Sequence, residues 1–255
     1  MKKQIIIIGI LVVIAIIFGV IADRAPKQNP IPNKPIQQAD TVHMVTIDQQ
    51  TDYAIASGTY PQFTNASASF NQKITDVVQT AIAEQFKNSQ DNWQARIDTR
   101  SPGDAIPEHP TDADKFPITI SADIIRNDSI ISVLLHINEF SGGAHGQELL
   151  YTYNYDVAQK TEITLDTFIQ KDSQFLQKLS AVSRTMLRTQ LAKSAQIKES
   201  EVDTDMLNSG TTPTVDNFSL FTLPNDTTMA VYFSQYQVGP YVYGSPQITI
   251  NLPLK

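Results

Sequence analysis

The residues best able to do chemistry are two histidines and a glutamate that lie close together in the sequence. They are His136, His145 and Glu148. Imidazole nitrogens and a carboxylate bind a metal ion when they converge on one point. No His-Glu-x-x-His pattern is present, and His136 stands in an alternating apolar segment, which is typical of a partly buried histidine in a strand. We therefore expect no metal site, and the sequence implies no cofactor.

Patterns for nucleophilic catalysis are also missing. Ser141 precedes His145 by four positions, but this spacing within a loop does not fix their geometry. Neither Gly-x-Ser-x-Gly nor Ser-x-x-Lys occurs. Acidic residues are so numerous that the sequence cannot select the two carboxylates that glycoside hydrolysis requires. We expect no catalytic residues and no enzymatic activity.

A glycine-rich segment offers the first candidates for ligand contact. Residues 140–146 are Phe-Ser-Gly-Gly-Ala-His-Gly and lie between two predicted strands. Gly142, Gly143 and His145 are the candidate contacts. The alternative is that the two glycines only permit positive φ and close packing at a bend.

A cluster of tyrosines around a Gly-Pro turn offers the second set of candidates. Tyr236, Tyr241 and Tyr243 flank Gly239 and Pro240. Tyrosine presents a flat apolar face and a hydroxyl group, which suits sugar and protein surfaces. We expect Tyr241 and Tyr243 to contact a ligand. Tyr236 is a weaker candidate, because we expect it to pack under a sheet.

The charge of the chain excludes one class of partner. The whole sequence has 19 Lys and Arg and 26 Asp and Glu, but residues 41–255 have 14 basic and 24 acidic residues. An acidic domain repels nucleic acid and anionic lipid and attracts cations. We expect no nucleic-acid partner, although the charge can also serve solubility alone.

The N-terminus predicts a membrane segment. Lys2 and Lys3 precede an apolar run at 5–22, whose 18 residues cover roughly 27 Å as a helix, close to the thickness of the hydrocarbon core. The preceding lysines place the N-terminus in the cytoplasm and the rest of the chain outside. We expect a single-pass anchor in the plasma membrane. The alternative is a signal peptide cleaved after Ala22, which would leave a secreted protein.

Cysteine content and proline content characterise the chain beyond the apolar run. The sequence contains no cysteine, which excludes a lipoprotein signal, disulfides and thiolate metal sites. Residues 23–40 contain four prolines among polar residues and predict an extended linker.

The remaining residues predict an α+β fold in two similar-sized halves, 41–146 and 147–255. In the first half, apolar spacing predicts these elements: strands at 42–50, 53–60, 116–124 and 131–137, and a helix at 67–88. In the second half it predicts these: strands at 149–157, 218–223, 228–233 and 248–252, and a helix at 173–192. Antiparallel sheets, each backed by a long helix, fit this order.

Three segments carry a resemblance to known domains. They are Tyr60-Pro61-Gln62-Phe63 with the helix after it, the 140–146 segment, and residues 232–244. Together they resemble the paired uncharacterised extracytoplasmic domains in the ectodomain of RsiV, an anti-sigma factor and lysozyme receptor. Similar domains precede the catalytic domain of a peptidoglycan deacetylase. The resemblance covers about residues 42–254, and the third segment is its most specific part.

The resemblance implies a binding function rather than a defined activity. Four residues precede Ile5 and the sequence stops at Lys255, so we expect neither a sigma-binding region nor a deacetylase catalytic domain. The resemblance implies a membrane-anchored, extracytoplasmic binding module for a lysozyme-like protein or for peptidoglycan. The alternatives are a wall-modifying hydrolase or deacetylase-associated protein, and a structural or assembly factor of the envelope.

Overall fold

The computed structural model describes residues 41–254. The predicted anchor at 5–22 and the predicted linker at 23–40 lie outside these residues. Within 41–254, no helix combines the length and the apolar character that crossing a membrane requires.

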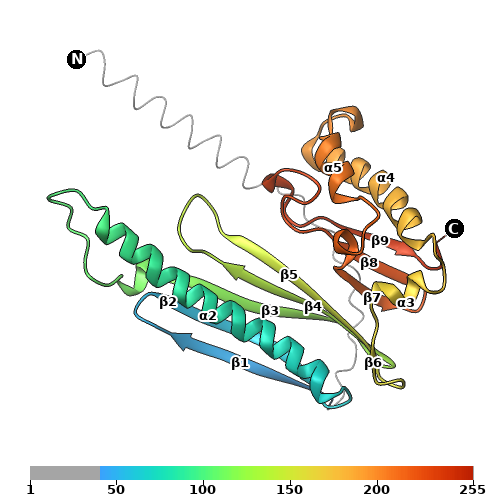
Figure 1. Cartoon of the computed structure of the whole chain (residues 1–255), viewed down its shortest axis with the longest axis horizontal. Helices are drawn as coiled ribbons and strands as arrows, with labels where there is room; N and C mark the ends of the chain where they lie inside the picture. The colour runs from blue at the N-terminus through green and yellow to red at the C-terminus, as the bar shows by residue number, and fades with distance from the viewer. Residues whose placement is uncertain (1–40, 255) are drawn as a thin grey trace. The chain divides into compact units, whose positions relative to one another are not determined.

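The first sheet has six strands in sequence order. They are β1 (Val42–Gln50), β2 (Ala54–Phe63), β3 (Phe116–Asn127), β4 (Ile130–Glu139), β5 (Gln147–Asp156) and β6 (Thr161–Glu162). All neighbouring pairs are antiparallel except β2 and β3, which run parallel (Figure 1). The predicted α+β fold is confirmed, but the prediction of a wholly antiparallel sheet is wrong at this pair. Helix α2 (Ala68–Asp98) returns the chain to the starting end, as a parallel pair requires.

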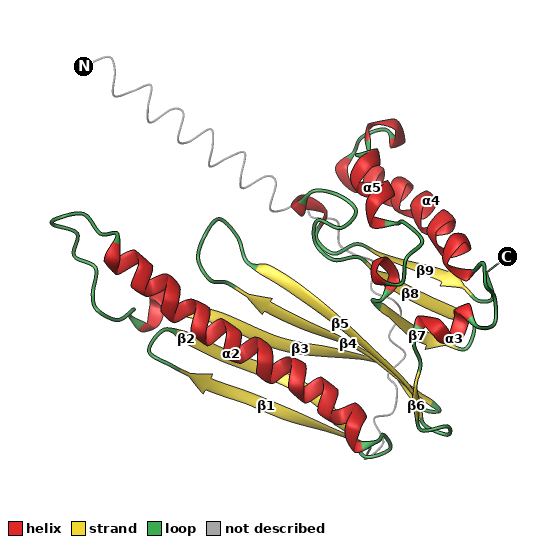
Figure 2. Ribbon diagram, in the orientation of Figure 1, coloured by secondary structure: helices red, strands yellow, loops and turns green. Residues whose placement is uncertain are grey.

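Helix α2 covers one face of this sheet (Figure 2). It begins where the Ser67 hydroxyl accepts a hydrogen bond from the Phe70 N–H, which caps a free backbone donor. Its buried side chains recur at helical spacing: Phe70, Ile74, Val78, Ala81, Ile82, Gln85, Ser89 and Trp93. The helix extends ten residues beyond the predicted end at Asn88. Trp93 is buried there, and its indole N–H donates to the Glu108 carbonyl oxygen at 3.1 Å.

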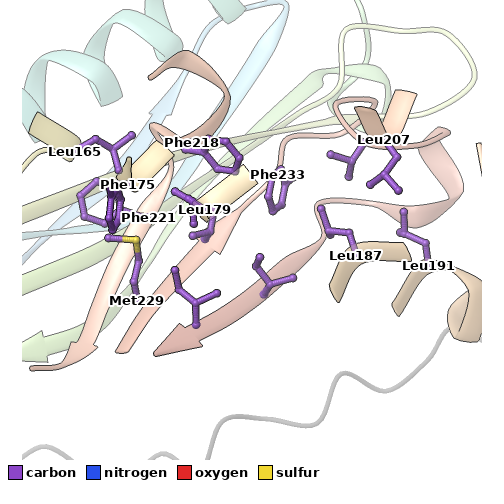
Figure 3. Close-up of a cluster of buried hydrophobic side chains, with 14 of the residues drawn as sticks. Leu165, Phe175, Leu179, Leu187, Leu191, Leu207, Phe218, Phe221, Met229 and Phe233 are labelled. Carbon is purple, nitrogen blue, oxygen red and sulfur yellow. The ribbon is translucent and has the colours of Figure 1, made fainter. Parts of the chain in front are cut away.

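The second sheet is smaller and antiparallel. Its strands are β7 (Phe221–Asn225), β8 (Thr228–Tyr232) and β9 (Gln247–Asn251). Helix α4 (Phe175–Ala195) packs on it, with α3 (Leu165–Ile169) and α5 (Thr204–Gly210) beside it. Figure 3 shows apolar side chains of the helices and strands meeting in one cluster, with Leu179 near Phe218 and Phe233.

The two sheets pack face to face. Leu134 and Leu150 of the first sheet contact Ala230 and Tyr232 of the second. The described residues therefore form four layers, with a helix outside each sheet. Residues 41–254 supply two apolar cores of buried side chains, so we expect the fragment 41–255 to fold as a unit.

Strand β5 lies in a different sheet from the one we predicted. We expected it to open the second half, but it pairs with β4 from Glu139↔Gln147 to Ile130↔Asp156. The border between the two sheets therefore falls after β6, and not at 146/147. The cause is the 140–146 loop, which turns the chain straight back along β4.

Candidate functional site

Two loops that are distant in sequence meet at one end of β5. The 140–146 loop joins β4 to β5, and the 234–246 segment joins β8 to β9 (Figure 1). The His145 and Tyr241 rings stack with centroids 3.9 Å apart and planes 21° apart. The Tyr241 hydroxyl donates to the Gly146 carbonyl oxygen at 3.2 Å, and the Tyr236 hydroxyl lies 3.3 Å from His145 Nε2. Three of the six candidate residues thus form one cluster.

The three tyrosines do not divide as we predicted. Tyr236 is 52% exposed, so the prediction that it packs under a sheet is wrong. Its φ of +66° turns the side chain outward. The neighbouring Gln237 fixes this turn, because its amide donates to the carbonyl oxygens of Gly210 and Asn217. Tyr243 instead is partly buried against the apolar core between α4 and the second sheet, which makes it a weaker candidate for ligand contact.

The glycines of the 140–146 loop adopt the conformation that their type permits. Gly142 and Gly143 have φ values of +92° and +102°. A side chain at either position would meet no backbone atom, so space is not the constraint there. The predicted positive φ is confirmed for both, and their contact with a ligand stays a prediction.

Helix α2 holds the start of this loop through a residue that the sequence analysis did not single out. Gln85 is 1% exposed, and its amide donates to the carbonyl oxygens of Phe140 (2.9 Å) and Pro117 (3.3 Å). Its Oε1 accepts from the Ser141 hydroxyl at 2.7 Å. Asn92 donates to the Ser141 carbonyl oxygen at 2.9 Å. Gln85 lies at helical spacing from the apolar residues Ala81 and Ile82, where an apolar residue is expected. A glutamine at such a position is the sequence signal that could have identified it.

A cavity of about 290 Å³ opens beside the cluster. Its lining combines amide, hydroxyl and carboxylate groups with two rings, and contains no Lys or Arg. The lining residues are Pro117, Thr119, Asn138, Glu139, Phe140, Gly146, Gln147, Glu148, Gln235 and Tyr241. Glu148 N–H donates to Gln235 Oε1 at 3.3 Å, which links the first sheet to the 234–246 segment.

His136 lies between two carboxylates next to this cavity. Its Nε2 is 3.3 Å from Asp123 Oδ2 and its Nδ1 is 3.1 Å from Glu148 Oε1. The Ser245 hydroxyl donates to the other Glu148 oxygen at 2.7 Å. Hydrogen bonds to Asp123 and Glu148 raise the pKa of His136 to about 9 and lower the pKa of both acids.

The His136 cluster is a structural ion pair that also connects β3, β4 and β5 to the 234–246 segment. Both imidazole nitrogens face carboxylate oxygens, so neither is directed into the cavity as a free base. Among residues 41–254, no group of His, Asp and Glu side chains has the geometry to hold a metal ion.

The raised pKa of His136 predicts how stability depends on pH. A group whose pKa is higher in the folded state stabilises the fold fully below its unfolded pKa, here 6.5, and this contribution is lost as pH rises through about 9. We expect the free energy of unfolding to fall over this window in urea titrations. His136→Gln should flatten this part of the profile. An unchanged slope in the variant would show that another group causes it.

The two carboxylates of the cavity come from opposite faces of the sheet. Glu148 pairs with Asn138 in the β4–β5 ladder, and side chains alternate between faces along a strand. Glu139 therefore projects toward the side of α2, whereas Glu148 projects toward the second sheet. Burial and the nearby Glu84 raise the pKa of Glu139. This arrangement does not set the two acids opposite each other across a substrate, as a glycosidase pair would be.

Two family models match the chain, one in each part. The model described as Deacetylase PdaC matches residues 47–148, and the model described as a protein of unknown function (DUF3298) matches residues 166–252. The two regions stand in tandem, which confirms the resemblance inferred from the sequence.

Among the proteins similar to the chain are a curated protein and a solved structure. Peptidoglycan-N-acetylmuramic acid deacetylase PdaC of Bacillus subtilis strain 168 is 30% identical over 124 residues, which are 49% of this chain and 25% of that protein. The match thus spans a quarter of the relative's length. A DUF3298 family member from Bacteroides fragilis aligns with a TM-score of 0.51 and 13% identity, covering 82% of this chain and 89% of that one. This likeness shows a shared fold.

Proposed function

We propose that residues 41–254 are a non-enzymatic binding module of the bacterial cell envelope whose ligand is the glycan of peptidoglycan. The observation that carries the proposal is the cavity between the 140–146 loop and the 234–246 segment. The curated relative is named as a deacetylase of peptidoglycan N-acetylmuramic acid, which supports an envelope glycan as the ligand.

The lining of the cavity has the chemistry of a sugar site. Sugars present hydroxyl groups that both donate and accept hydrogen bonds, and Asn138 and Gln235 supply amides that do both. Sugars also present an apolar face of C–H groups, which packs on aromatic rings such as that of Tyr241. A volume of about 290 Å³ is at the lower end of the usual range for small-molecule sites. One or a few sugar units are therefore the expected occupants.

A second candidate ligand is a cationic protein such as lysozyme. The observation that favours it is the excess of 24 acidic over 14 basic residues in 41–255. Attraction between opposite net charges speeds association and is screened by salt. Binding of lysozyme should therefore weaken steeply between low and high salt, whereas binding of an uncharged glycan should change little.

The test is equilibrium binding of the fragment 41–255 to purified peptidoglycan, to chitooligosaccharides and to lysozyme at two salt concentrations. We expect saturable glycan binding without release of acetate, reducing sugar or muropeptides. If the fragment binds lysozyme but neither peptidoglycan nor chitooligosaccharides, the cationic protein is the ligand instead of the glycan. Product release well above buffer would instead support the hydrolase alternative.

We further propose that residues 5–22 remain attached as a single-pass anchor in the plasma membrane. The length of the apolar run and the lysines before it support this. Mass spectrometry of the membrane fraction should find the intact N-terminus on the protein. A mature N-terminus at Asp23 would show that the run is a cleaved signal peptide.

A further inference from the structure

A row of side chains extends from the cavity across the first sheet to its edge strand, β1. Glu148 of β5 pairs with Asn138 of β4, which pairs with Thr119 of β3. Thr119 pairs in turn with Ser57 of β2, and Ser57 pairs with Asp48 of β1. Directly paired residues share a face of the sheet, so the whole row lies on the face opposite α2. The first three residues line the cavity, whereas Ser57 and Asp48 lie beyond it.

The face that carries this row is open over β1, β2 and β3. Figure 2 shows α2 on the other face, and the second sheet contacts this face through Leu134 and Leu150 of β4 and β5. The polar side chains beyond these contacts are exposed: Thr46, Asp48, Ser57, Thr119, Ser121 and Asn138. Within residues 41–254, none of them forms a hydrogen bond or an ion pair through its side chain. Their donors and acceptors are therefore available to a ligand.

The chemistry of the open face favours a neutral, hydroxylated ligand. Its exposed side chains include no lysine or arginine, so it does not attract a polyanion. They are short and polar, and thus lack the aromatic anchors that are enriched in protein interfaces. Hydroxyl and amide groups both donate and accept hydrogen bonds, as the hydroxyl groups of a sugar do.

We infer that a peptidoglycan glycan strand leaves the cavity across this open face and lies over β3, β2 and β1. The inference rests on the proposed function and specifies how much of the ligand is bound. The cavity holds one or a few sugar units, so the rest of a polymeric ligand has to leave it over a neighbouring surface. Thr119 and Asn138 belong both to the cavity and to the open face, which makes the two surfaces continuous.

The spacing of the β-strands suits a glycan that crosses them. Neighbouring strands lie about 4.8 Å apart, close to the length of one sugar unit, so each unit meets about one β-strand. Four such spacings separate β5 from β1, which gives a path of roughly 19 Å.

The cavity and the open face contribute to affinity in different ways. In the cavity, the ring of Tyr241 packs on one sugar unit. On the open face, each hydrogen bond to the ligand replaces one to water, so its net effect is small. Affinity should therefore grow with the number of sugar units rather than depend on one side chain of the row.

The experiment measures affinity against ligand length by isothermal titration calorimetry of the fragment 41–255. The ligands are the dimer, tetramer and hexamer of N-acetylglucosamine. We expect the hexamer to bind at least about thirtyfold more tightly than the dimer, because each added unit gains a hydrogen bond worth a severalfold increase in affinity. This gain exceeds the statistical effect of the additional positions at which a longer oligomer can occupy the cavity.

A double variant tests the outer part of the path. Ser57→Ala/Asp48→Ala removes two hydrogen-bonding groups beyond the cavity and should lower the ratio of hexamer to dimer affinity about tenfold. Ser101→Ala/Asp104→Ala changes the same residue types at exposed positions in the loop after α2 and should preserve this ratio. All four positions are exposed, so both variants should keep the parent's melting temperature within a few degrees.

The possible failures of the inference and of the proposed function differ. Equal affinity for dimer and hexamer, or a length dependence that Ser57→Ala/Asp48→Ala leaves unchanged, overturns the inference and leaves the proposed function standing. Absence of binding to every oligomer and to peptidoglycan overturns the proposed function, and the inference with it.

Amide chemical shifts of the parent fragment provide a second test that needs no substitution. The hexamer should shift amide signals of β1 and β2 around Asp48 and Ser57, whereas the dimer should shift only those around the cavity. Hexamer-induced shifts that are confined to the cavity, or that extend from it to α4 instead, would contradict the path over β3, β2 and β1.

Discussion

Replacing Tyr241 by alanine is expected to weaken binding of peptidoglycan glycan about thirtyfold, the effect of removing a side chain worth about 2 kcal/mol. The ring lines the cavity and stacks on His145, and its hydroxyl holds the Gly146 carbonyl oxygen. The variant thus loses an aromatic ring that lines the cavity and a contact between the 140–146 loop and the 234–246 segment. Isothermal titration calorimetry with chitooligosaccharides measures the change.

Two neighbouring substitutions separate ligand contact from loop structure. Val242→Ala alters a side chain that is 79% exposed and is not among the residues that line the cavity beside Tyr241, so it should bind like the parent. Tyr236→Ala removes an exposed ring in contact with His145 and should have an intermediate effect. If Tyr241→Ala has the parent's melting temperature and the parent's affinity, the site lies elsewhere on the domain.

Residue types identified the members of this cluster, but not how they meet. The sequence singled out His145 and Tyr241 because a glycine-rich loop and a Gly-Pro turn expose side chains. Their stacking depends on the packing of one sheet on the other, which joins residues 96 positions apart in the sequence. Tyr236 was misjudged because its outward turn is set by Gln237, whose partners Gly210 and Asn217 lie in another segment.

The same limit explains which parts of the fold were predicted. Apolar spacing located β1, β3, β4 and β5, since it depends only on neighbours within each strand. The parallel pairing of β2 and β3 could not be read from that spacing, because alternation carries no strand direction. The last ten residues of α2 are mostly polar, and the buried Trp93 among them donates a hydrogen bond to the loop that follows the helix.

Replacing Gln85 by leucine is expected to lower the free energy of unfolding by about 3 kcal/mol, or the melting temperature by roughly 10 °C. Leucine fills similar space but makes no hydrogen bond. The Phe140 carbonyl oxygen and the Ser141 hydroxyl would each lose a partner in a half-buried position. The carbonyl oxygen of the exposed Pro117 would lose one donor and keep the Phe140 N–H. Buried polar groups left without partners each cost about 1–3 kcal/mol.

Matched variants show whether this loss comes from the anchoring of the loop. Gln72→Leu changes the same residue type on the same helix, at an exposed position bonded to Asp76, and should shift stability by less than about 0.5 kcal/mol. Ser141→Ala removes one of the three contacts of Gln85 and should cost about 1 kcal/mol.

The consequence for binding depends on the position of the loop. When Gln85 no longer holds its first residues, the loop presents His145 to Tyr241 less often, so amide hydrogen exchange at 140–146 should accelerate and glycan affinity should fall. A Gln85→Leu variant that exchanges and binds like the parent would show that the loop keeps its conformation without the helix. A variant that loses affinity while exchange at 140–146 stays slow would show that Gln85 does not affect binding through the mobility of this loop.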